Sequence, residues 1–358
     1  MSYSSYATSD SLAGKFWSKD LQRSVRDNLE IAPLIGKDAN SIIQEKDEMK
    51  KGFGDQVTFG IRMKYNGDGL SETDTAEGSG EALTTYSTSV TINELGHVGG
   101  AKSENSIDQQ RVGFDIREEV RDNLSEWWAE RMSKTFFNHV CGYTPQTSLK
   151  YTGNNATIGN TAGRRIIAGG QANDQSITAS DTFTLDLIDN AVEMAKVGDN
   201  MIRPLNIKGG KKYVLYLHPY QVTSLRKNSS TGQWLDIQKA AMQGGQVSDN
   251  PIYTGALGEY NGVILRQSQD VTQGVSSVTA TTAVTTVRRA VLLGAQAAVV
   301  AYGQGPYGGT RYRWNEELLD HKRKIEVSAW SIFGMKKVQY NSIDYGVITI
   351  STYAAAAS

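Results

Sequence analysis

The run closest to a ligand-binding motif is Gly303-Gln-Gly305-Pro-Tyr-Gly308, which follows the apolar residues 297–302. A Gly-x-Gly-x-x-Gly turn after a strand can hold a dinucleotide pyrophosphate on its backbone amides. Here Pro306 removes one amide, and the residues from Arg311 onwards show no helix start. About fifty residues follow, too few for the rest of a nucleotide-binding half. A glycine-rich connection is therefore favoured, and a nucleotide-dependent enzyme stays as an alternative.

The other side chains that could do chemistry are scattered. The four histidines (His97, His139, His218 and His321) form no His-Glu-x-x-His pair and have no cysteine neighbours at zinc-finger spacing, so each is predicted to be structural. The single cysteine, Cys141, ends an apolar helical pattern and is predicted to be a buried thiol. No nucleophile elbow, P-loop or kinase motif occurs. We expect no catalytic residue, cofactor or metal, although one sequence cannot show an acid pair formed across the fold.

An acidic segment covers residues 66–82 and contains no Lys or Arg. Clustered carboxylates bind calcium, but the order Asp-x-Asp-x-Asp-Gly and its closing Glu are missing. A solvated tip is therefore the favoured interpretation. Its carboxylates are Asp68, Glu72, Asp74, Glu77 and Glu81.

The segments that flank this tip are predicted to be two facing strands. Apolar and polar residues alternate over 56–64 and again over 86–92. An isolated two-stranded ribbon is marginal in water, and one with an apolar face of roughly 30 Å needs a cover. The cover could be the same chain's core or a neighbouring subunit, and the long tip favours the neighbour. The apolar face of the first strand carries Val57, Phe59, Ile61 and Met63.

Helical spacing predicts one helix in a polar N-terminal arm, through Phe16, Leu21, Val25 and Leu29, and a long helix over residues 106–140. Trp127 and Trp128 on the long helix lie about 100° apart around its axis, so this helix should pack on two sides.

A second lobe is predicted after residues 144–180, which are rich in Gly, Asn, Thr and Ser. Its elements are a helix over 185–197, a strand over 213–217, a helix after Pro219 and a helical piece over 234–242. Strand-like runs follow over 262–300, 325–333 and 345–353. The predicted fold class is α+β.

Composition limits the function. The chain has 358 residues with 39% hydrophobic and 21% charged residues, as in a folded water-soluble protein. Its longest apolar stretch, residues 290–303, is shorter than the roughly 20 residues of a membrane helix, and no secretory signal opens the chain. A formal net charge of -1 predicts at most weak, unspecific DNA contact. The 17 Tyr and 6 Trp suit large interfaces.

Several segments resemble the N4-like major capsid family of tailed bacteriophages, which has the Hong Kong 97 fold. They are Glu77-Gly-Ser-Gly-Glu-Ala-Leu83, Phe114-Asp-Ile-Arg-Glu-Glu-Val120 with Trp127-Trp-Ala-Glu130, Leu217-His-Pro-Tyr-Gln221 and Asn250-Pro-Ile-Tyr-Thr-Gly-Ala-Leu-Gly-Glu-Tyr-Asn-Gly262. The resemblance implies an N-terminal arm (1–53), an extended β-hairpin loop (54–100), a spine helix with the first part of a peripheral domain (101–179), an axial domain (180–303) and C-terminal peripheral strands (304–358).

The same resemblance implies a major capsid protein that assembles into the hexamers and pentamers of an icosahedral head around double-stranded DNA. Expected partners are copies of the same chain, decoration or scaffolding proteins and a portal, with assembly in the host bacterial cytoplasm and no membrane. A head decoration protein is a further alternative. The inter-subunit contact candidates are Val57, Phe59, Ile61, Met63, Glu72, Asp74, Glu77, Glu81, Trp127 and Trp128.

Overall fold

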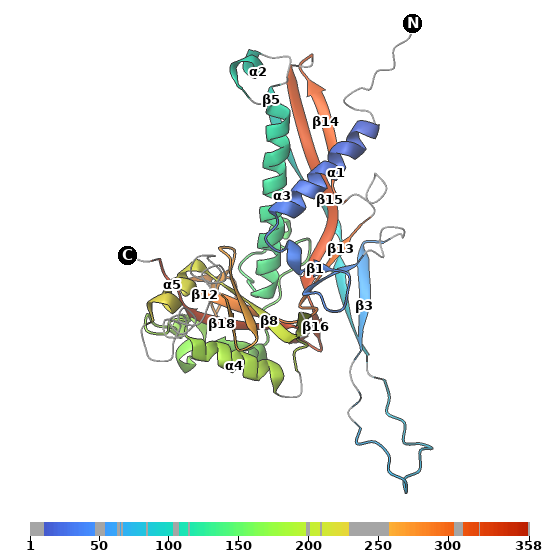
Figure 1. Cartoon of the computed structure of the whole chain (residues 1–358), viewed down its shortest axis with the longest axis vertical. Helices are drawn as coiled ribbons and strands as arrows, with labels where there is room; N and C mark the ends of the chain where they lie inside the picture. The colour runs from blue at the N-terminus through green and yellow to red at the C-terminus, as the bar shows by residue number, and fades with distance from the viewer. Residues whose placement is uncertain are drawn as a thin grey trace, which may run out of the picture.

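The computed structural model is elongated, with a long upright helix, a sheet beside it, a lobe at its lower end and a thin tip that extends away from the body (Figure 1). It mixes helices with mostly antiparallel sheets, in agreement with the predicted α+β class. The structure describes residues 11–46, 54–62, 65, 67–83, 85–102, 107–113, 115–197, 201–207, 210–228, 258–303, 311–321 and 323–356.

The long helix is α3 (Ile116–Val140), whose length is about 37 Å at 1.5 Å per residue. The prediction of one continuous helix from 106 to 140 is wrong, because α2 (Ile107–Arg111) is a separate short helix. The side chain of Asp115 accepts a hydrogen bond of 2.8 Å from the backbone N of Arg117 and so caps a new helix start.

The predicted arm helix is α1 (Ser11–Asn28), which lies across α3 (Figure 1). Its buried residues Leu21 and Val25 join the same hydrophobic core as Leu124 of α3. At the edge of this contact Arg121 of α3 pairs with Asp20 at 2.8 Å. The arm is therefore part of the subunit core over these residues. It continues into η1 (Ala32–Leu34), β1 (Ile35–Gly36) and β2 (Ile43–Lys46).

A six-stranded sheet lies beside α3 (Figure 1). Its order is β1-β2-β13-β15-β14, with β5 paired to the other edge of β15. The strand β15 alternates, so that Ile325, Val327 and Ala329 are buried in the core that contains α1 and α3. The further strands are β5 (Asn93–Lys102), β13 (Ala298–Tyr302), β14 (Arg313–Leu319) and β15 (Lys324–Lys337).

The lobe contains an eight-stranded sheet in the order β6-β18-β12-β8-β10-β9, with β7 paired to β8 and β11 to β12. The helices α4 (Leu185–Lys196) and α5 (Pro219–Lys227) supply residues of its own hydrophobic core. The strands are β6 (Arg165–Ile167), β7 (Leu205–Ile207), β8 (Gly210–Leu217), β9 (Glu259–Tyr260), β10 (Val263–Gln267), β11 (Gln273–Val275), β12 (Ala283–Leu293) and β18 (Val347–Tyr353).

Irregular segments join the two sheets. They contain η3 (Leu149–Tyr151), η4 (Ala162–Arg164), η5 (Ala168–Gly170) and η6 (Asp174–Ser176), and a small ladder of β16 (Gln339–Tyr340) with β17 (Ile343–Asp344).

Two strands lie in other sheets than the domain boundaries predicted from the sequence would place them. β13, expected in the axial domain, lies in the six-stranded sheet, and β18, expected among the peripheral strands, lies between β6 and β12 in the other sheet. Six of the seven residues of β18 are buried, which suits a central strand covered on both faces. The remaining domain boundaries stay predictions, and the helical piece predicted over 234–242 lies outside the described residues.

Candidate assembly surfaces

The predicted hairpin is present as β3 (Gln56–Arg62) and β4 (Thr85–Thr91), which pair antiparallel. Val57 lies opposite Val90, and Ile61 lies opposite Tyr86. The alternation in the sequence therefore gave the correct strands and the correct apolar face. Met63 lies outside the described residues.

The cover of this apolar face comes from the same chain. Val57 and Ile61 are 3% and 9% exposed, and they share a cluster with Val299 and Val338, against which Phe59 is partly buried. The expectation that a neighbouring subunit covers Val57, Phe59 and Ile61 is wrong at this base of the hairpin. The reason is covalent: β4 runs directly into β5, whose pairing with β15 draws the hairpin onto the six-stranded sheet.

Close packing at this crossing depends on two residues far away in sequence. A Cβ added to Gly334 would lie 2.1 Å from the backbone O of Thr91, so only glycine fits there. The Asn155 side chain accepts from the backbone N of Thr91 and donates to its O, both at 2.9 Å. Asn155 was missed in the sequence, where it stands in an irregular polar stretch.

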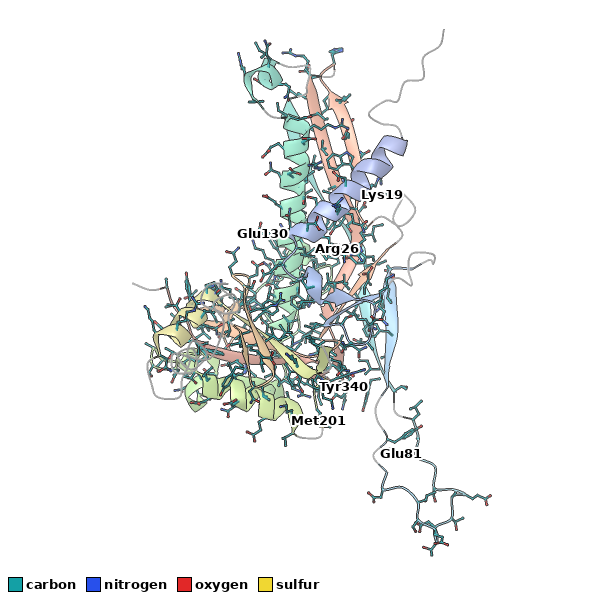
Figure 2. All side chains as sticks on the ribbon, viewed as in Figure 1. Lys19, Arg26, Glu81, Glu130, Met201 and Tyr340 are labelled. Atoms are coloured by element: carbon teal, nitrogen blue, oxygen red, sulfur yellow. The ribbon has the colours of Figure 1, made fainter. Side chains whose placement is uncertain are left out.

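The acidic tip, defined as residues 67–83, extends beyond the body of the subunit (Figure 2). Its described side chains are exposed. Glu81 accepts a 2.9 Å hydrogen bond from the backbone N of Gly67, and Asp74 accepts from the N and Oγ of Ser71 at 2.7 and 2.6 Å. These bonds lower the pKa of Asp74. The tip thus has local order of its own, and Glu72 and Glu77 remain exposed on it.

Trp127 and Trp128 differ, as their spacing predicted, but one of them is not on a surface. Trp128 is fully buried, with its ring centroid 5.0 Å from that of Tyr312, so its proposed inter-subunit contact is wrong. Trp127 is half-buried and stacks on His97 at 4.5 Å, with the Arg131 guanidinium 4.8 Å from its ring. Trp127 stays a contact candidate.

Buried ion pairs fix the junction of the two sheets. Lys337 and Asp344 have fully buried side chains, with Nζ 2.9 Å from Oδ1, and Lys337 also donates to Gly159 O at 3.1 Å. Arg289 of β12 pairs with the buried Asp174 at 2.7 Å. Sequence patterns did not indicate these pairs, because a lone Lys or Arg in a strand gives no sign of its partner.

His139 is buried beside this junction, at the C-terminal end of α3. Its Nε2 lies 2.7 Å from the O of Thr152, so that nitrogen carries the proton and donates. Burial and the nearby Lys337 and Lys336 lower the pKa of His139 to about 4. The residue is structural, as predicted from the sequence.

The subunit is elongated, with an exposed acidic tip and buried polar pairs in its body (Figure 2). A family model described as phage capsid protein matches residues 5–356. The chain belongs to this phage capsid protein family. The major capsid protein of Pseudomonas phage KPP25 is 26% identical over 389 residues, which cover 99% of this chain and 98% of that protein.

Solved capsids share the fold of this capsid protein. The capsid of Ralstonia phage GP4 matches with a TM-score of 0.75 and 29% identity over 91% of this chain and 90% of that one. The capsid of cyanophage Pam1 matches with a TM-score of 0.70 and 18% identity over 100% and 95% of the two chains. These likenesses agree with the Hong Kong 97 type of fold. The family match, the Pseudomonas phage relative and the Ralstonia phage capsid together show a major capsid protein of a bacteriophage, which is a structural protein.

A structural role accounts for the His218 motif of the capsid protein and for one residue of the glycine motif. His218 and Gln221 form a capping box at the start of α5, in which His218 Nδ1 accepts from the N of Tyr220 at 3.2 Å. Gly303 directly follows β13, and its backbone N donates to the O of Ile332 in β15 at 2.9 Å. Residues 304–310 lie outside the described residues. Within the described part of the chain, no cluster of His, Cys, Asp and Glu could hold a metal ion, and no helix is long and apolar enough to cross a membrane.

Proposed function

We propose that this capsid protein assembles, in the host bacterial cytoplasm, into hexamers and pentamers of an icosahedral shell that encloses double-stranded DNA in the virion. The observation that supports this most is the acidic tip, which extends well beyond the packed body of its own subunit (Figure 1). A segment ordered by its own hydrogen bonds and exposed along its length suits a contact with another copy.

The charge of the tip limits what it would contact. Its carboxylates include Glu72 and Glu77, and no Lys or Arg lies within it, so a neighbouring copy should offer basic side chains or backbone amides. Trp127, half-buried on α3, is a second candidate contact. The base of the hairpin should instead stay packed on its own subunit during assembly, because Val57 and Ile61 lie in that subunit's hydrophobic core.

Contact with packaged DNA would be weak and unspecific, given the net charge of -1. The pair Arg164 and Arg165 is a poor candidate for it, because Arg164 is only 4% exposed and Arg165 is half-buried. Decoration or scaffolding proteins and a portal are partners that the shell function implies.

The test is to replace residues 67–83 with a short Gly-Ser linker and to compare assembly with the wild-type chain by analytical sedimentation. The subunit should keep its fold by circular dichroism, because the tip lies outside the three hydrophobic clusters. Large particles should form from the wild-type chain and be lost or strongly reduced in the variant. Equal particle yields from both chains would contradict the role of the tip.

A further inference from the structure

A cavity of about 220 Å³ lies between the arm helix and the six-stranded sheet. The helix α1 supplies Gln22, Val25, Arg26 and Leu29 to its wall, and the sheet side supplies Glu45, Tyr302, Arg311 and Tyr312, with Ala32 and Ile35 between them. This volume exceeds the 10–15 Å³ that one water needs, so the cavity has room for a side chain.

One wall residue has an unmet hydrogen bond. Glu45 is 7% exposed, and its Oε2 accepts from Arg311 Nη2. Its Oε1 is buried and has no hydrogen-bond partner among the residues that the structure describes. Leaving a carboxylate oxygen buried without a donor is costly. The last torsion of Glu is broad, so a small rotation can turn Oε1 towards a donor that enters the cavity.

The charge of the wall selects the kind of donor. Arg26 and Arg311 carry two positive charges against the single negative charge of Glu45, so an ammonium or guanidinium would be repelled. A neutral amide fits better: its N–H can serve Glu45, its C=O can accept from Arg26, and its carbon atoms can lie against Val25 and Leu29.

We propose that this cavity is a docking site for an amide group of a second copy of the chain, from an Asn or Gln side chain or from the backbone. The inference rests on the proposed shell function, which places copies in permanent contact. A peptide amide held between α1 and the sheet would tie the arm of one subunit to its neighbour.

The direct test is cryo-electron microscopy of wild-type particles. Chain density from an adjacent copy, seated in the cavity within hydrogen-bond distance of Glu45, is the expected result. Particles that show only solvent or a separate small molecule there would overturn this docking site and leave the shell function standing. A wild-type chain that forms no particles would overturn both.

A variant adds a kinetic test with a matched control. Ala32→Leu fills the cavity from its own wall, and Val214→Leu fills a second cavity of about 220 Å³ that Pro33 and Leu205 also line. Ala32→Leu should slow particle formation at least about tenfold relative to Val214→Leu, with the unassembled subunits unfolding at similar temperatures. Equal assembly rates of the two variants would refute the proposal. If either variant fails to fold, the cryo-electron microscopy density of the wild-type particles decides whether the cavity is a docking site.

Discussion

Replacing Val57 with Ala should destabilise the subunit before any assembly. Val57 is 3% exposed and lies opposite Val90, which is 1% exposed, in a cluster that includes residues of β13. Two buried carbons at about 0.8 kcal/mol each give about 1.6 kcal/mol. The cavity left behind raises the expected loss in the free energy of unfolding to about 2–3 kcal/mol.

Urea unfolding of unassembled subunits, followed by tryptophan fluorescence and circular dichroism, measures this loss. The matched control is Thr58→Ala, one residue along β3 on the exposed face, which should change the free energy of unfolding by less than about 0.5 kcal/mol. Suppose instead that Val57→Ala unfolds like the wild type when unassembled and yet blocks assembly. The cover of the hairpin would then come from a neighbour, and the packing described for this chain would be refuted.

Three further predictions concern the junction and the tip. Lys337→Met should cost about 3–5 kcal/mol of unfolding free energy in denaturant titration, since it leaves the buried Asp344 without its cation; a loss below about 1 kcal/mol would argue against the pair. His139 has its pKa lowered to about 4, so between pH 6.5 and 4 only the unfolded chain takes up its proton and stability falls with acidification, by up to about 3 kcal/mol. Above pH 6.5 this contribution to stability is fully present. Unfolding titrations of His139→Gln should therefore show a weaker dependence of the unfolding free energy on pH between 4 and 6.5 than the wild type. An unchanged dependence would mean that other groups cause it. The double change Glu72→Gln with Glu77→Gln should leave subunit stability within about 0.5 kcal/mol while making the assembly rate, followed by light scattering, less sensitive to salt; identical salt dependence would show that these carboxylates face no charge.

Local patterns in the sequence were sufficient for most helices and strands. The spacing of Leu21, Val25 and Leu29 gave α1, and the alternation around Val57 gave β3. Where the prediction of one long helix failed, a local signal was present. Gly113 is followed two residues later by Asp115, a good N-cap, with Glu118 three residues after that. The helical periodicity on both sides outweighed it.

Contacts between distant segments were not accessible in this way. Nothing in the hairpin sequence shows that Thr91 packs closely against Gly334 and hydrogen-bonds to Asn155. Nor does it show that β13 packs against Val57. The spacing of Trp127 and Trp128 showed that they face different ways, but not which of them is buried. The exposed acidic tip could be predicted because charge and glycine content are local, whereas its receptor on another copy is not.

The shell function has one most direct measurement, which is electron microscopy of the purified protein after assembly at high concentration. Closed icosahedral particles built from hexamers and pentamers are the predicted result. Small discrete oligomers under every condition, with no closed shell, would contradict it.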